Sequence, residues 1–137
     1  MKRPVLATTT VLAATLSLAA CQPTSEATPS SEAVAKEWQL VGFSGDSLPP
    51  RVTMDLREAG KASGQAPCNR WFGAVEGSLP DFRIGQAGAT RMACPDLEAE
   101  GAFLTALGQI STAAIEGDKL ILTGSDGVRM EFTAKAP

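Results

Sequence analysis

Short runs of alternating apolar and polar residues recur along most of the chain and predict β-strands. In the run 38–42, Trp38, Leu40 and Gly42 alternate with a glutamine and a valine, and side chains two positions apart share one face of a strand. Comparable runs follow at 52–56, 60–64, 72–75, 82–84, 113–115, 120–123 and 128–132. Asp126-Gly127 separates the last two runs and is a strong hairpin signal. The pattern predicts a mainly antiparallel sheet.

One stretch has helical periodicity instead. Phe103, Leu107 and Ile110 recur at i, i+4 and i+7, which places them on one apolar helix face. Pro95 suits the start of a helix and Gly108 suits its end. Acidic residues in the first turn favour the positive end of the helix dipole, and here they are Asp96, Glu98 and Glu100. We predict a single helix near residues 96–108.

The first twenty residues have the pattern of an export signal. Lys2 and Arg3 form a positive start, and the apolar stretch that follows is too short to span a bilayer. It ends in Leu18-Ala19-Ala20-Cys21, which resembles the lipobox of bacterial lipoproteins. The resemblance implies that residues 1–20 are a lipoprotein signal peptide and that Cys21 carries a diacylglyceryl thioether and an N-acyl chain such as palmitate. An ordinary cleaved secretion signal is the alternative.

Residues 21–36 are predicted to be the lipid anchor and a flexible tether. Pro, Ser, Thr, Ala and Glu dominate them, and Val34 is the one sizeable apolar residue, too little to offset the entropy of ordering. Two or more acyl chains hold a protein stably at a membrane. Gln22 after the cysteine favours, by resemblance to enteric bacteria, the periplasmic face of the outer membrane. We therefore expect a location in the cell envelope, with the membrane as a partner through Cys21.

Composition excludes several classes of function. The chain has no histidine and no tyrosine, so it has no Ser-His-Asp or Cys-His pair and no histidine-ligated zinc. Removal of Lys2 and Arg3 leaves ten basic against fifteen acidic residues, a net charge of −5, which argues against a nucleic-acid partner. No motif requires a cofactor or a metal. These observations favour a protein that is not an enzyme.

Two cysteines remain once Cys21 is assigned to lipid. In an exported protein Cys68 and Cys94 meet an oxidising compartment, which favours a disulfide between them. Two free thiols and a redox-active pair are the alternatives. The two residues lack the C-x-x-C spacing of redox motifs.

Landmarks spread over residues 37–133 match a known family. They are Trp38-Gln39-Leu40, Cys68-Asn69-Arg70, Thr90-Arg91-Met92-Ala93-Cys94, Glu100 with Phe103-Leu104, and Gly117-Asp118-Lys119-Leu120. In these residues the chain resembles the META domain, also called HslJ-like, of bacterial envelope lipoproteins. The resemblance implies an α+β domain over residues 37–134, with a mainly antiparallel curved sheet or partly open β-barrel and one packed helix. It also implies that the two cysteines pair.

The sequence departs from the family pattern near the first of these cysteines. Pro67 stands where relatives usually have glycine, and Trp71 and Phe72 stand where they have tyrosines. Asn69, Arg70, Trp71 and Phe72 are the candidate binding residues, because an amide, a cation and two aromatics adjoin the cysteine. The alternative is structural: Asn69 turns the backbone, both aromatics fill the core and Arg70 is solvated.

The resemblance implies no reaction, and it associates the family with envelope stress and antibiotic tolerance. We therefore expect a non-enzymatic, lipid-anchored envelope protein that binds a protein or an apolar ligand or supports stress tolerance. A barrel mouth between sheet and helix would be the natural pocket. The alternative is a periplasmic inhibitor of a lysozyme-like or other hydrolase, which would insert a loop into the enzyme's cleft. Residues 45–50 and 70–73 are the candidate loops.

Overall fold

The computed structural model describes residues 31–45 and 47–136. The predicted signal segment, the lipidation site Cys21 and most of the predicted tether lie outside these residues. In chain order the elements are α1 (Ser31–Val34), β1 (Glu37–Phe43), β2 (Thr53–Asp55), β3 (Lys61–Gln65), β4 (Arg70–Glu76), β5 (Arg83–Ala89), α2 (Leu97–Leu107), β6 (Ile110–Glu116), β7 (Lys119–Gly124), the 3-10 turn η1 (Ser125–Gly127) and β8 (Arg129–Ala134). Within the described part of the chain, no helix has the length and apolar character needed to cross a membrane.

The strands form one eight-stranded antiparallel sheet in the order β5-β4-β3-β2-β1-β8-β7-β6. The sheet curls until its two edges meet at one end. There the Phe82 amide donates to the Ser111 carbonyl (3.1 Å) and the Ala113 amide donates to the Pro80 carbonyl (2.9 Å). The predicted curved sheet or partly open barrel is confirmed.

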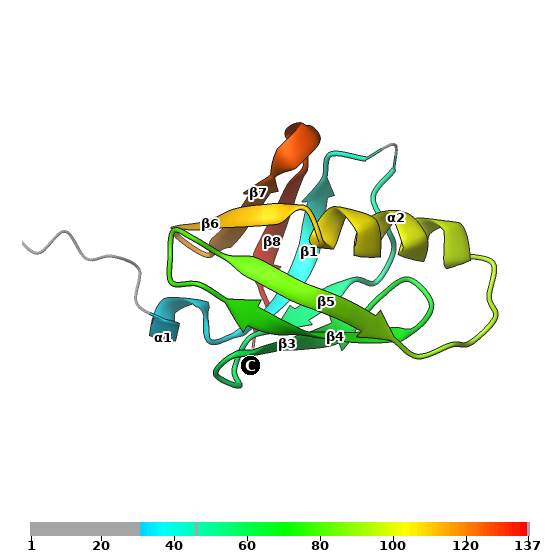
Figure 1. Cartoon of the computed structure of the whole chain (residues 1–137), viewed down its shortest axis with the longest axis horizontal. Coiled ribbons are helices and arrows are strands. Elements are labelled where there is room, and N and C mark those ends of the chain that lie inside the picture. The colour runs from blue at the N-terminus through cyan, green and yellow to red at the C-terminus, as the bar shows by residue number, and fades with distance from the viewer. Residues whose placement is uncertain (1–30, 46, 137) are drawn as a thin grey trace, which may run out of the picture.

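The barrel stays open at its other end because helix α2 replaces a strand there. Asp81, just before β5, pairs antiparallel with Thr112 in β6. If this pairing continued along β5, its partners would be the residues before Ile110, but these residues form α2. Figure 1 shows α2 in line with β6 and lying over β5. The predicted helix near 96–108 is therefore present, and its apolar face closes the gap in the sheet.

Large side chains fill the space between the sheet and α2. Trp38, Trp71, Phe103 and Phe132 are fully buried there. The rings of Trp71 and Phe103 pack edge to face, with centroids 5.8 Å apart, an arrangement that aromatic pairs favour. The interior is consequently a packed core contributed by both ends of the chain and by the helix.

The last residues of the predicted tether contact the folded domain. Ser31–Val34 form the short helix α1, and Val34 packs against the core. The Val34 carbonyl also accepts a hydrogen bond from the Trp38 indole nitrogen (2.9 Å). One apolar residue is enough to attach this short helix to the domain, because the buried Trp38 supplies both a surface for Val34 to pack against and a hydrogen-bond donor for its carbonyl. Val34, which lies within the predicted tether of residues 21–36, therefore packs as part of the folded domain.

Candidate functional site

The four consecutive candidate residues are divided between the two faces of the sheet and the turn before it. Asn69 is buried in the turn, and Trp71 points into the core with 1% of its surface exposed. Arg70 is exposed, and Phe72 lies on the outer face with 57% exposed. The prediction that both aromatics fill the core is wrong for Phe72. Successive strand residues point to opposite faces, so two adjacent aromatics in β4 could not both be buried.

Trp71 is held in the core by a specific polar contact. Its indole nitrogen donates to the Thr53 carbonyl in β2 (3.0 Å). The same carbonyl lies only 2.0 Å from the position that a Cβ atom would take at Gly64. A side chain at position 64 would therefore displace the carbonyl, so Gly64 is needed for the tryptophan to keep its acceptor.

The turn that leads into β4 is organised by a buried carboxylate on α2. Glu100 is 5% exposed. Its Oε2 accepts from the backbone amides of Cys68 (2.9 Å) and Asn69 (2.6 Å), and its Oε1 accepts from the Asn69 side-chain amide (2.8 Å). The interpretation of Glu100 as a helix-dipole residue missed this role. The available signal was its spacing: Glu100 precedes Phe103 by three residues and Leu107 by seven, so it shares the apolar helix face.

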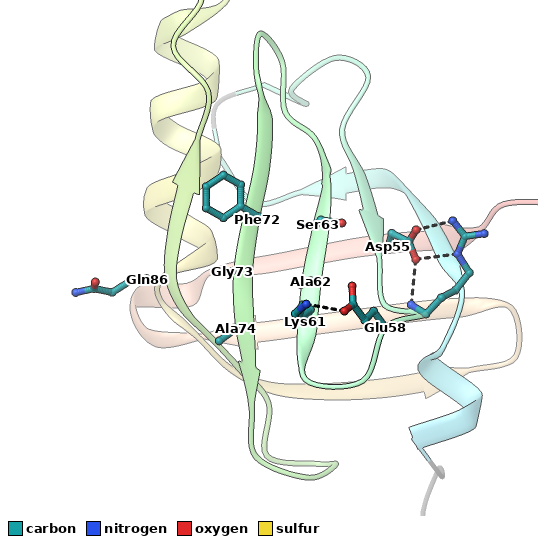
Figure 2. Close-up of a pocket in the computed structure, with 10 residues that line it drawn as sticks. Asp55, Glu58, Lys61, Ala62, Ser63, Phe72, Gly73, Ala74 and Gln86 are labelled. Atoms are coloured by element: carbon teal, nitrogen blue, oxygen red, sulfur yellow. Dashed lines mark hydrogen bonds and ion pairs between the residues drawn. The ribbon is translucent and has the colours of Figure 1, made fainter.

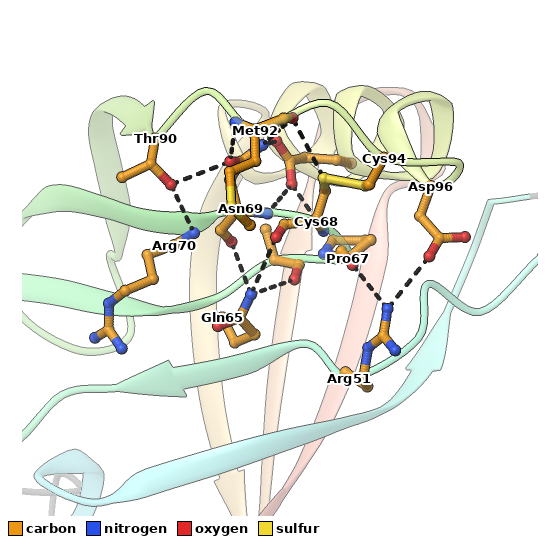
Figure 3. Close-up of a disulfide and its surroundings, with 12 residues drawn as sticks. Arg51, Gln65, Pro67, Cys68, Asn69, Arg70, Thr90, Met92, Cys94 and Asp96 are labelled. Carbon is orange, nitrogen blue, oxygen red and sulfur yellow. Dashed lines mark hydrogen bonds and ion pairs between the residues drawn. A yellow bond between two sulfur atoms is a disulfide. The ribbon is translucent and has the colours of Figure 1, made fainter.

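The Asn69 side chain connects the same turn to the segment before α2, as Figure 3 shows. Its Oδ1 accepts from the Met92 amide (2.6 Å) and from the Thr90 hydroxyl (3.1 Å). The disulfide between Cys68 and Cys94 joins these two segments covalently, with the Cα atoms 6.1 Å apart. The predicted disulfide is confirmed. Asn69 lies in the turn, but its side chain bonds to Thr90, Met92 and Glu100, which are distant in the sequence, and to no group of its own turn within the described residues. We call this group (Cys68, Asn69, Cys94 and Glu100) the disulfide turn.

A shallow hollow of about 730 Å³ lies on the outer face of β2–β5 (Figure 2). The pairing of β2 with β3, of β3 with β4 and of β4 with β5 places Asp55, Ser63, Phe72 and Gly88 in one row across the sheet. The hollow is lined by three of these residues, Asp55, Ser63 and Phe72, together with Arg57, Glu58, Lys61, Ala62, Gly73, Ala74 and Gln86. We call this region the Phe72 hollow.

The Phe72 ring is fixed on the floor of this hollow by a neighbouring glycine. A Cβ atom at Gly88 would lie 2.8 Å from the ring, so the ring occupies the space that a side chain on β5 would take. Such a cross-strand pair shields the glycine backbone. Figure 2 shows the ring face-on between β4 and β5. One face therefore rests on the sheet while the other stays open.

The opposite rim of the Phe72 hollow carries two ion pairs. The Arg57 Nε donates to Asp55 Oδ1 (2.9 Å), and the Lys61 ammonium donates to Glu58 Oε1 (2.6 Å). Hydrogen bonding from the Arg57 guanidinium lowers the pKa of Asp55 and raises the pKa of Arg57. The two acidic and two basic side chains cancel in charge, so the rim offers donors and acceptors without a net charge.

A second hollow, of about 750 Å³, lies between α2 and the loop after β1. This is the predicted mouth between sheet and helix, and its lining mixes apolar residues with three carboxylates. Asp96, Glu98 and Asp126 line it, and none of its described lining residues is basic. We call it the helix-side hollow.

Neither hollow has the form of a metal centre. The described residues include no group of three or more histidine, cysteine, aspartate or glutamate side chains placed to hold a metal ion. In the disulfide turn, the buried Glu100 carboxylate is committed to backbone and side-chain amides.

Comparison with known families identifies the fold. A model of the META domain matches residues 31–137. The chain belongs to the META domain family. The match begins at Ser31, where α1 begins. No curated protein matches the chain.

Two solved structures show the same architecture as this META domain. An NMR structure of a protein from Burkholderia xenovorans has 24% sequence identity and a TM-score of 0.66, covering 78% of this chain and 87% of that one. A crystal structure of a DUF4847 family protein from Bacteroides vulgatus has 12% identity and a TM-score of 0.58, covering 76% of this chain and 95% of that one. Sequence identities this low show that the fold is shared and nothing more.

Proposed function

We propose that this META-domain protein is a non-enzymatic, lipid-anchored envelope protein that binds its partner at the Phe72 hollow. The anchor would be Cys21, after Leu18-Ala19-Ala20, and the envelope would be its location. The observation that carries the binding role is the open face of Phe72. Exposed aromatic surface held on a rigid sheet is characteristic of binding sites, because it gains contact area at little cost in conformational entropy.

The chemistry of the chain supports binding over catalysis. The sequence has no histidine to serve as a general base. At the Phe72 hollow, the carboxylates Asp55 and Glu58 are paired with Arg57 and Lys61. A paired carboxylate with a lowered pKa is a poor proton acceptor at neutral pH, and Asp55 is such a group.

The packing of the interior favours a surface partner over an apolar ligand inside the barrel. Trp38, Trp71, Phe103 and Phe132 occupy the space that such a ligand would need. The mouth beside α2 has three carboxylates in its lining, whereas apolar ligands select mostly apolar pockets. Support of envelope stress tolerance would follow from the proposed binding at the outer face.

The binding role is tested by photo-crosslinking in intact cells. A photoreactive residue replaces Gln86 at the edge of the Phe72 hollow, and the matched control replaces Ala114, an exposed residue of β6 outside it. We expect an adduct from position 86 and none from position 114. No adduct from position 86, or equal adducts from both, would refute the proposed site.

The anchor is tested by Cys21→Ser, which removes the thioether. We expect the variant to leave the membrane fraction and the unchanged chain to remain in it. Retention of the variant in membranes would contradict lipidation as the anchor.

A periplasmic inhibitor remains the second candidate, and one loop supports it. Leu48 is 50% exposed while the adjacent Pro49 is buried, so a leucine side chain projects from a braced loop. The other candidate segment, 70–73, is wrong as an inserting loop, because it lies within strand β4. Inhibition of a lysozyme that is lost in Leu48→Ser would support this function, and unchanged lysozyme activity in excess protein would exclude it for that enzyme.

A further inference from the structure

We propose that the Phe72 hollow binds a neutral saccharide, with the open face of the Phe72 ring as the stacking platform. This inference rests on the proposed binding function and names the chemical class of the partner. It is carried by the ring, by the small side chains around it and by the polar rim, which has no net charge.

The ring is placed as a platform. It is 57% exposed and lies against Gly88 on one side, and its other face points out of the hollow (Figure 2). One face of a pyranose ring presents C–H groups that carry partial positive charge. These groups pack on the negative face of an aromatic ring, so a flat, supported phenylalanine suits a sugar ring.

The surroundings of the ring leave room for a flat ligand. Ser63 and Ala74 face outward beside Phe72, and Ala74 is paired with Gly85 on β5. Ser63 and Ala74 are small residues of the lining, and the hollow measures about 730 Å³. Small-molecule sites commonly measure about 300–1,000 Å³, and the hollow has the size for a short saccharide segment.

The rim supplies partners for hydroxyl groups. The Ser63 hydroxyl and the Gln86 amide make no hydrogen bond to the described part of the chain, although both line the hollow. The paired Asp55 and Arg57 keep 29% and 64% of their side chains exposed. Each sugar hydroxyl both donates and accepts, so it can use a carboxylate oxygen and a guanidinium nitrogen that lie side by side.

Charge selects a neutral ligand over an ionic one. Asp55 and Glu58 balance Arg57 and Lys61 at the rim. A phosphate or an acidic peptide would need a net positive site, and a basic peptide would find a better site in the helix-side hollow with its three carboxylates. A saccharide without ionised groups needs neither a net positive nor a net negative site.

The inference is tested by calorimetric titration of the full-length lipidated protein in detergent micelles. The probes are two neutral β-1,4-linked oligosaccharides, one of N-acetylglucosamine and one of glucose, and an uncharged amphipathic peptide. We expect saturable binding of at least one oligosaccharide and none of the peptide. Binding of the peptide alone, or of no probe, would overturn the inference.

Three variants assign the binding to the ring. Phe72→Ala removes the platform, and we expect affinity to fall about tenfold or more, which corresponds to the contribution of one good aromatic contact. Phe72→Trp keeps a platform, so affinity should be retained or increased. Met92→Ala is the matched control, because Met92 is 63% exposed and is not among the lining residues. Thermal unfolding of each variant reports whether the fold is retained.

The outcomes separate this inference from the proposed function. Equal affinity in wild type and a folded Phe72→Ala would overturn the role of the ring. A protein adduct from position 86 together with no oligosaccharide binding would overturn the saccharide inference while the proposed binding site stands. No adduct from position 86 together with no oligosaccharide binding would overturn both the proposed binding site and the saccharide inference.

Discussion

The disulfide turn and the Phe72 hollow meet in one short stretch of the chain, residues 68–74, yet their polar groups are used in opposite ways. In the turn, Glu100 and Asn69 are buried and hydrogen-bonded to other parts of the protein. In the hollow, Ser63 and Gln86 line an open surface around Phe72. The polar groups of the turn bond to other parts of the protein, whereas those of the hollow face a surface that a partner can reach.

This difference separates structural from binding residues without any knowledge of a ligand. Burying polar groups is tolerated only when they find partners, so the satisfied network at Glu100 is explained by the fold alone. An aromatic face that stays open to solvent does not contribute the folding free energy that its burial would have gained. The account therefore predicts that changes in the turn lower stability, whereas changes in the hollow lower binding and leave stability nearly unchanged.

The sharpest contrast is between two neighbouring residues of β4. Trp71→Ala should lower the free energy of unfolding by about 4 kcal/mol, because it leaves a large cavity in the core. Phe72→Ala should lower it by less than about 1 kcal/mol, as expected for an exposed position. Urea unfolding of both variants measures the difference. Similar losses for the two would contradict the assignment of opposite faces.

Loss of the disulfide should have the next largest effect. Cys68 and Cys94 are 26 residues apart, and a bridge closing a loop of that length contributes about 3.5 kcal/mol in the chain-entropy model. The double variant Cys68→Ala/Cys94→Ala should lose that amount in the free energy of unfolding while keeping its oligosaccharide affinity. A parallel loss of affinity in folded protein would show that the turn and the hollow are coupled.

The buried carboxylate gives a more selective test of the turn. Glu100→Gln replaces one acceptor oxygen with an amide that faces donors, and should cost about 2 kcal/mol of unfolding free energy. Glu98→Gln is the matched control on the exposed side of α2 and should change stability by less than about 0.5 kcal/mol. If the two carboxylates acted only through the helix dipole, both variants would lose the same amount.

The rim of the hollow should contribute a small, pH-dependent stability. Hydrogen bonding from Arg57 lowers the pKa of Asp55 in the folded protein, so the pair stabilises the fold above the unfolded pKa of about 4. That contribution is lost as the pH falls from about 4 through the lower folded pKa. Asp55→Asn should remove this part of the acid dependence in urea unfolding between pH 7 and pH 3. An unchanged acid profile would show that the pair does not stabilise the fold.

Most of the fold follows from the sequence pattern, and the exceptions have physical reasons. The alternation at 38–42 and the Asp126-Gly127 hairpin predicted β1, β7 and β8 within a few residues. Only the start of β5 was predicted, because its later residues, Gly85 to Ala89, are too small to give an apolar alternation. The packing of Val34 onto the domain was missed, because one partly buried valine does not alter the composition of a tether.

The candidate site was predicted only in part. The disulfide and the turn at Asn69 could be read from residue types and their spacing. The role of Glu100 depends on a contact 31 residues distant in the chain, and the helical spacing indicates only that it faces the core. The exposure of Phe72 was available from strand alternation, but the hollow beside it is formed by four strands whose order only the folded sheet shows.

One face of the Phe72 ring covers Gly88, and the open face is the part that we propose to serve binding. The most direct measurement is the yield of adduct from the photoreactive residue at position 86, compared between the wild-type chain and Phe72→Ala at equal thermal stability. The account predicts that the adduct is lost in Phe72→Ala. An equal yield from both chains would contradict it.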